Sequence, residues 1–147
     1  MGRRGLLGPA LASLALLSAG CGSDDGPALT FDGTDEEQIA ATVNTMTAAI
    51  AAGEGAVACE LMTDRGQQAM IRFGRQVFDT EGVGSCEQAV PVVADAGYDP
   101  GDFRVTVRDV SIEPGADRAQ VNCEFRGGFL LLHTSDGWRV NIPYCFD

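Results

Sequence analysis

The stretch GFLLLHTSDGWRVNI, residues 128–142, decides the fold class. Residues 129–132 are all apolar, and after the turn sequence Ser-Asp-Gly apolar residues alternate with polar ones. Alternation with a period of two is typical of a strand with one buried face, and Ser-Asp-Gly favours a tight hairpin. The stretch therefore predicts two antiparallel strands. The second strand has four apolar residues predicted on one face: Trp138, Val140, Ile142 and Tyr144.

Two more strands are predicted upstream. One ends at the turn Arg-Gly-Gly and has its apolar residues on a single face: Ala119, Val121, Cys123 and Phe125. In the other, the apolar alternation of residues 103–107 continues out of phase at residues 110–112. A slip of one residue at Arg108 and Asp109 is what a β-bulge produces, so we predict a bulge there.

The first half of the chain has a helical period instead. Thr34 and Glu37 match a capping box, and apolar residues follow at spacings of three and four up to Gly53, which favours a stop. This predicts a helix over 35–52. Residues 56–62 and 63–78 predict two further helices, the latter capped by Thr63.

A last helix is predicted after residue 85, where Ser85 and Gln88 repeat the capping chemistry. Pro91 lies too late to start that helix, which predicts that it is short or ends by Val90. Helices first and an antiparallel meander last is an α+β order. We therefore expect one α+β domain over 34–147, with three or so helices packed on a sheet of about four strands.

The first twenty residues have the layout of a secretory signal peptide. Arg3 and Arg4 precede an apolar run from Leu6 to Leu17, too short to cross a bilayer as a helix, and small residues follow. The junction "SAGC" at residues 18–21 resembles the lipobox of bacterial lipoproteins, although Ser18 stands where the commonest lipobox has Leu. The resemblance implies cleavage before Cys21.

Cys21 is accordingly expected to carry lipid: a diacylglyceryl thioether on its sulfur and a further acyl chain, such as palmitate, on its amino group. Two or more chains anchor stably where one holds only marginally. The predicted localisation is the extracytoplasmic side of the cell membrane, with the lipid bilayer as partner through Cys21. Residues 22–33 are rich in Gly, Asp, Thr and Ser and are predicted to form a flexible tether.

The charge of the chain argues against nucleic-acid binding. The formal net charge is −11, and removal of residues 1–20, which hold two arginines and no acids, makes it −13. Such a surface repels phosphate backbones, so we expect no nucleic-acid partner.

The element order, with "AAIAAGEGAVACELMT" at 48–63 and "DGWRVNIP" at 136–143, resembles small secreted members of the nuclear transport factor 2-like superfamily. That resemblance implies a cone in which helices pack into the concave face of a strongly curved antiparallel sheet. The broader cystatin-like fold is the structural alternative.

With Cys21 assigned to lipid, four cysteines remain, and three disulfide connectivities are possible. The resemblance favours Cys59 with Cys86, and the pairing of Cys123 with Cys145 then follows by exclusion. A metal site is the alternative use of these cysteines. It is not expected, because no two cysteines are two to four residues apart and His133 is the chain's only histidine.

No nucleophile motif, phosphate-binding glycine loop or metalloprotease motif occurs in the chain. The cone-shaped superfamily does include isomerases and dehydratases that use aspartate, tyrosine or histidine in an apolar pocket. Five residues are weak catalytic candidates on that basis: Asp109, His133, Tyr144, Tyr98 and Asp102. For Asp109 the structural alternative, a solvated aspartate on a bent strand, is favoured over catalysis.

The segment 129–132 points instead to a binding function. Phe129 and Leu131 would face one side of the sheet, and Leu130 and Leu132 the other. If helices cover one face only, a homodimer partner, another protein or the chain's own terminus around Phe146 must cover the second pair.

Three functions follow as hypotheses: a non-catalytic lipoprotein that binds a ligand or partner, an isomerase or dehydratase, and an accessory subunit of an envelope assembly. No cofactor is expected for any of them.

Overall fold

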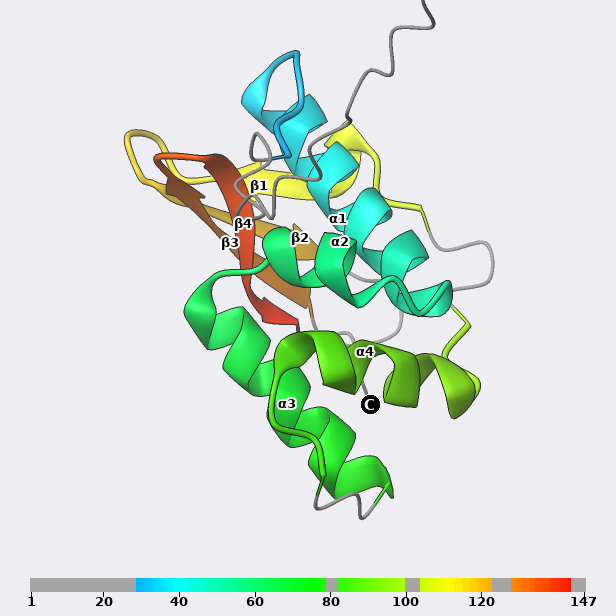
Figure 1. The fold of residues 1–147 in the computed structure, drawn as a ribbon. Helices are drawn as coiled ribbons and strands as arrows, with labels where there is room; N and C mark the ends of the chain where they lie inside the picture. The colour runs from blue at the N-terminus through cyan, green and yellow to red at the C-terminus, as the bar shows by residue number, and fades with distance from the viewer. Residues whose placement is uncertain (1–28, 79–81, 100–103, 123–127, 144–147) are drawn as a thin grey trace, which may run out of the picture.

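The computed structural model describes residues 29–78, 82–99, 104–122 and 128–143. Within these stretches, helices precede a four-stranded antiparallel sheet, which confirms the α+β order (Figure 1). The helices are α1 (Asp35–Ala51), α2 (Gly55–Glu60), α3 (Asp64–Phe78) and α4 (Cys86–Asp95). The strands are β1 (Val110–Ile112), β2 (Arg118–Asn122), β3 (Gly128–Thr134) and β4 (Gly137–Pro143).

Helix α1 starts and stops where its local sequence predicts. The Thr34 hydroxyl accepts from the Glu37 N–H, and the Glu37 carboxylate accepts from the Thr34 N–H at 2.8 Å, which completes a capping box. Gly53, with φ of 72°, follows the last turn in the left-handed conformation that glycine tolerates best. Four large apolar side chains of α1 are fully buried: Ile39, Val43, Met46 and Ile50.

The predicted early end of α4 was wrong, because the helix continues through Pro91 to Asp95. Ser85 caps it by accepting from the Gln88 N–H at 3.3 Å. Since proline has no N–H, Pro91 removes only the helical bond to the carbonyl of Glu87. Gly55 of α2 lies against that carbonyl, so closely that a Cβ on Gly55 would come within 2.5 Å of the Glu87 oxygen. The freed carbonyl therefore lies at a close contact between α2 and α4.

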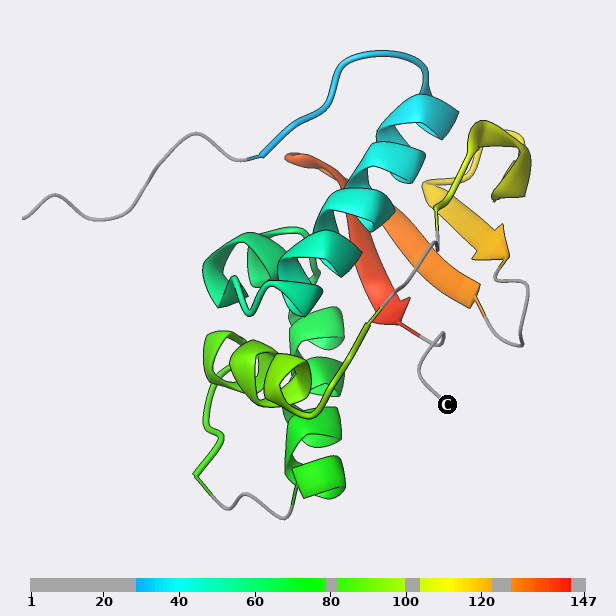
Figure 2. The ribbon, with the colours of Figure 1, turned by 90° about the vertical axis from the view of Figure 1, so that its right-hand side faces the viewer.

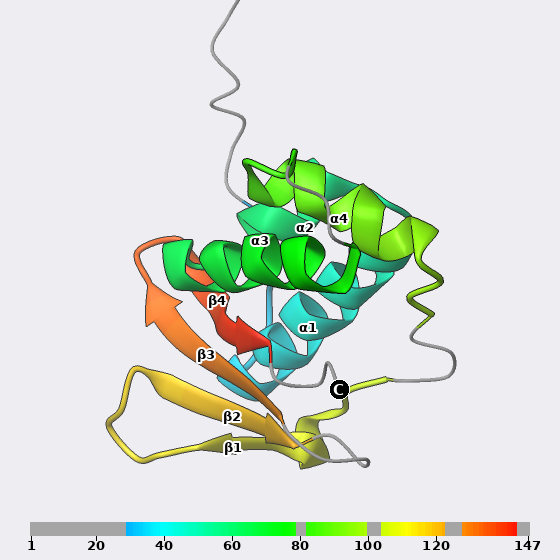
Figure 3. The same ribbon diagram turned by 90° about the horizontal axis from the view of Figure 1, so that it is seen from below.

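The four strands form a meander in the order β1-β2-β3-β4, and all neighbouring pairs are antiparallel. The helices gather on one side of this twisted sheet (Figures 2 and 3). The face toward the helices carries buried side chains: Ala119, Val121, Phe129, Leu131, Trp138 and Val140. Leu130 and Leu132 lie on the other face and are half-buried.

The β-bulge lies elsewhere than predicted. Residues Val107–Asp109 form a 3₁₀ turn, η1, which is followed by the short strand β1. The phase change in the sequence marks this turn, and Val107 is 48% exposed rather than on a buried strand face.

The irregularity in the sheet falls between β3 and β4 instead. Leu131 pairs with Val140 and Leu130 with Ile142, so Asn141 is the extra residue. The bulge places Ile142 on the face of Leu130, whereas the sequence had predicted it beside Trp138 and Val140.

The outer edge of β4 is covered by the segment between α2 and α3. The N–H of Val140 donates to the carbonyl of Leu61 at 2.9 Å, and the N–H of Thr63 donates to the carbonyl of Val140 at 2.9 Å. These bonds form a parallel bridge between Met62 and Val140. An edge strand with unpaired backbone groups invites pairing with other chains, and this bridge satisfies the two backbone groups of Val140 internally.

Candidate functional site

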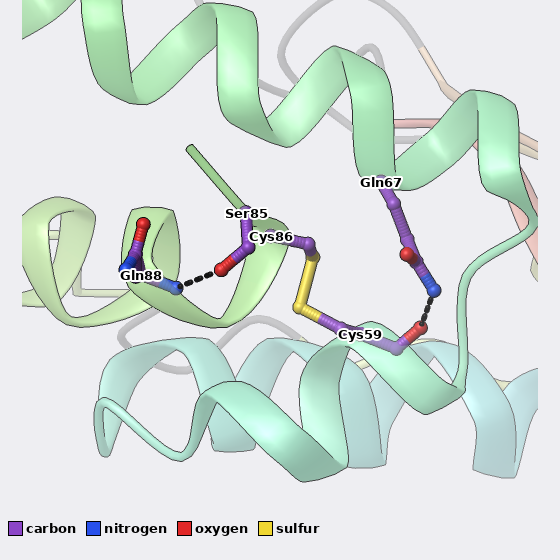
Figure 4. The surroundings of a disulfide bond; sticks show 5 residues. All are labelled: Cys59, Gln67, Ser85, Cys86 and Gln88. Atoms are coloured by element: carbon purple, nitrogen blue, oxygen red, sulfur yellow. Dashed lines mark hydrogen bonds between the residues drawn. A yellow bond between two sulfur atoms is a disulfide. The ribbon is translucent and has the colours of Figure 1, made fainter. Parts of the chain in front are cut away.

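The structure contains the disulfide between Cys59 and Cys86, which confirms the first predicted pairing (Figure 4). It joins α2 to α4 with a Cα–Cα distance of 6.0 Å, and both cysteines are 4% exposed. The Cys59 carbonyl also accepts from the side chain of Gln67 on α3 at 2.9 Å. Three helices therefore converge on this bond. Cys21, Cys123 and Cys145 lie outside the described residues.

The Asp109 carboxylate accepts hydrogen bonds from within its own turn. Its Oδ2 accepts from the N–H of Thr106 at 2.7 Å and from the Thr106 hydroxyl at 2.9 Å. These hydrogen bonds, the backbone one first, hold the pKa of the Asp109 carboxyl below its usual range. A general base works best with a pKa near the operating pH, so the shift runs opposite to the one that catalysis would use. The carboxylate of Asp109 caps the 3₁₀ turn.

His133 lies exposed near the end of β3, level with Trp138 on β4. The two rings meet edge to face, with centroids 5.0 Å apart and planes at 80°. The indole N–H of Trp138 donates to Asp35 at the start of α1, at 3.0 Å. The three side chains form a contact chain that fixes the β3–β4 hairpin to the first turn of α1.

Tyr98 is half-buried and follows α4. Burial raises the pKa of its phenol to about 12, so the side chain stays protonated at neutral pH. Tyr144 and Asp102, the other two catalytic candidates, lie outside the described residues.

The structure does not bring Asp109 and His133 together. Val110, next to Asp109, is level with Phe129 through β2, and His133 lies four residues further along β3. At a rise of about 3.3 Å per residue and a strand spacing of about 4.8 Å, they are separated by about 13 Å along the strands and about 10 Å across them. A shared proton-transfer site would require hydrogen-bond distances.

Sequence reasoning missed several buried polar contacts. The Thr63 hydroxyl donates to the Asn141 carbonyl oxygen at 2.9 Å, at the bulge. Arg139 is 5% exposed and donates to the carbonyls of Trp138 and Leu29, both at 3.0 Å. Arg139 alternates with apolar residues on a strand, so the sequence predicts that its side chain faces solvent. Asn44 in α1 also makes hydrogen bonds outside its helix, to the backbone of Val105. Its sequence position offered a signal for such a contact, because asparagine is a poor residue for a helix interior.

Within the four described stretches, no group of three or more His, Cys, Asp and Glu residues comes together as a metal site would require. In the same stretches, no helix is both long and apolar enough to span a membrane.

The chain was compared with protein-family models, curated proteins and solved structures, and none of the three comparisons gave a match.

Proposed function

We propose that this protein is a bacterial lipoprotein whose Cys21 carries the acyl chains, and whose α+β domain binds a partner on the extracytoplasmic side of the membrane. The N-terminal support is the charged start, the apolar run and the junction "SAGC" at residues 18–21. The order of four helices and an antiparallel meander supports a nuclear transport factor 2-like domain as its class.

The observation that carries the proposal is the disulfide between Cys59 and Cys86. Stable disulfides form in exported proteins and are rare in a reducing cytosol. This one is buried where three helices converge, so a structural role suits it better than a redox role, which needs an accessible sulfur. An exported domain with a cysteine directly after an apolar leader matches lipid anchoring.

Binding is favoured over catalysis by the arrangement of the candidate residues. Asp109 is engaged in a cap, and His133 lies toward the opposite end of the sheet. An isomerase or dehydratase would gather such groups in one apolar pocket. Asp109 and His133 do not gather in this way.

The outward face of the sheet indicates that the partner is a protein. Leu130, Leu132 and Ile142 share the face of the sheet away from the helices and are half-buried. Phe129 and Leu131, by contrast, are core residues with exposures of 1% and 0%. The outward apolar side chains suit a second copy of the chain or an envelope assembly subunit.

Acylation is tested by expressing the full chain in a bacterium with a clickable palmitate analogue, then determining the mass of the membrane-extracted protein. We expect label, a mature N-terminus at Cys21 and loss of both in Cys21→Ser. Ser23→Ala is the matched neighbouring control and should keep the label. Unlabelled wild-type protein that retains residues 1–20 would overturn the anchor.

Partner binding is tested on the same membrane-bound protein by chemical cross-linking. Leu130→Glu and Leu132→Glu should reduce the cross-linked species, while Gln68→Glu, an exposed position on α3 away from this face, should leave them largely unchanged. Equal recovery of cross-linked species in all variants would count against this face as the interface.

A further inference from the structure

Residues 29–34 lie against the domain and form what we call the strap. The N–H of Leu29 donates to the Glu60 carboxylate on α2, and the guanidinium of Arg139 on β4 donates to the Leu29 carbonyl. Leu29 and Phe31 are partly buried against the core. At the other end of the strap, the Gln38 amide donates to the Gly33 carbonyl at 2.9 Å. Both ends are therefore attached to the domain (Figure 2).

Arg139 shows why the strap stays docked. Its guanidinium is buried and makes hydrogen bonds to two backbone carbonyls, one of which the strap supplies. A buried charge is costly unless it is hydrogen-bonded, so releasing the strap would remove one of its partners. Release would also expose the apolar side chains of Leu29 and Phe31 to water.

Docking of the strap shortens the segment that links Cys21 to the domain. Eight residues lead from Cys21 to Leu29, and they can reach at most about 28 Å. Without the strap, thirteen residues would lead to Thr34, with a reach of about 45 Å. A compact domain of this size is about 35 Å across, so the strap brings the maximum reach below the domain's own diameter.

The strap and the start of α1 lie at one end of the molecule, and α3 and α4 extend toward the other end (Figures 1 and 2). Asp35, Glu36 and Glu37 lie in the first turn of α1 at the strap end. Arg65, Arg72 and Arg75 are exposed on α3. Asp64 on α3 and Glu87 and Asp95 on α4 are exposed as well, so these charges balance and give the α3–α4 end no net attraction to an anionic bilayer.

We propose, on the basis of the lipid anchor above, that the strap sets the orientation of the domain and holds the strap end toward the bilayer. Turning α3 toward the lipid would lift Leu29 by close to the domain's diameter, about 35 Å. That lift exceeds the reach of about 28 Å that eight residues provide. The α3–α4 end is therefore presented away from the membrane.

The test uses the full acylated chain in anionic vesicles that contain an energy-transfer acceptor on the lipid headgroup. A fluorescent amino acid is placed at Asp136, in the β3–β4 turn three residues before Arg139, which bonds to the strap, or at Gln76, exposed near the end of α3. We expect stronger energy transfer to the lipid from position 136 than from position 76.

Two changes release the orientation by different means. Inserting about eight Gly and Ser residues between Ala28 and Leu29 extends the reach to about 55 Å and alters no described contact. Arg139→Gln removes the hydrogen bond to the strap, and Arg118→Gln, an exposed arginine on β2, is its matched control. The insertion and Arg139→Gln should both raise transfer from position 76, whereas Arg118→Gln should retain the wild-type difference.

The outcomes separate the two proposals. If the protein carries no acyl chain and does not bind vesicles, the lipid anchor is overturned. If it is acylated and bound but transfer is equal from both positions, or the insertion changes nothing, the orientation by the strap is overturned and the anchor stands.

Discussion

The side-chain amide of Asn44 forms hydrogen bonds with both the carbonyl and the N–H of Val105. Its Nδ2 donates to the Val105 carbonyl, and its Oδ1 accepts from the Val105 N–H, each at 2.9 Å. Asn44 lies in the middle of α1, and Val105 lies just before η1. One helical side chain thereby fixes the segment that leads into the sheet.

Asn44→Ala should lower the free energy of unfolding by about 1 to 3 kcal/mol, because two backbone groups of Val105 lose their partners. Urea denaturation measures this. Asn122→Ala, at the exposed end of β2, is the matched control and should stay within about 0.5 kcal/mol of wild type. Equal values for the two variants would show that the Asn44 bonds contribute little.

Gly66→Ala should destabilise the protein although alanine is the better helix former by about 1 kcal/mol. A Cβ on Gly66 would lie 2.4 Å from the carbonyl oxygen of Val140 and 3.1 Å from the Cβ of Met62. We expect a loss of about 1 to 3 kcal/mol, typical of an overpacked contact, by thermal or urea unfolding. In Gly82→Ala the new Cβ has no neighbour within 4 Å, so stability should hardly change. A more stable Gly66→Ala variant would refute this close approach of α3 to β4.

The double variant Cys59→Ala/Cys86→Ala should lose about 3.5 kcal/mol of stability, since the bond closes a loop across a sequence separation of 27. Denaturation under non-reducing conditions measures the loss. In the wild-type protein, an alkylating reagent should modify these two cysteines only after the disulfide has been reduced. Free thiols in the unreduced protein would contradict the bond.

Asp109→Asn should weaken the dependence of stability on acid. The folded-state pKa lies below the unfolded value of about 3.8, so the carboxylate stabilises the fold at neutral pH. That contribution is lost as the pH falls from about 5 through the unfolded value toward the lower folded one. Chemical denaturation at pH 7 and pH 3 should therefore differ less in Asp109→Asn than in wild type.

The control for that change is Asp117→Asn, an exposed aspartate just before β2, which should keep the wild-type acid dependence. If both variants respond to acid alike, the Thr106 hydrogen bonds do not set the behaviour of Asp109. If wild type itself shows no dependence between pH 7 and pH 3, the lowered pKa is refuted.

The helices were predictable because their signals are local. Thr34 and Glu37 mark the start of α1 within four residues, and Ser85 marks the start of α4. Pro91 misled the prediction because, at this position, proline removes a single helical hydrogen bond, the one to the carbonyl of Glu87, and the helix continues past it to Asp95.

The sheet was predictable in its strand order but not in its irregularity. A phase change in apolar alternation cannot distinguish a bulge from a 3₁₀ turn, and at Asp109 the turn is formed. The bulge at Asn141 is tied to Thr63, which lies 78 residues earlier. The strap was missed for a similar reason, since Gly, Asp and Thr predict a tether while Arg139 and Glu60, distant in sequence, hold it.

The bridge between Met62 and Val140 also limits how the protein can associate when many copies crowd together. In the described part of the sheet, β1 offers an incoming strand only three residues, Val110–Ile112, and at the β4 edge the bridge engages the N–H and carbonyl of Val140 in the middle of the strand. Fibrous growth by strand addition needs a longer template than that. Copies packed side by side thus find only short or interrupted templates at these edges, rather than one long enough for an extended ribbon to grow.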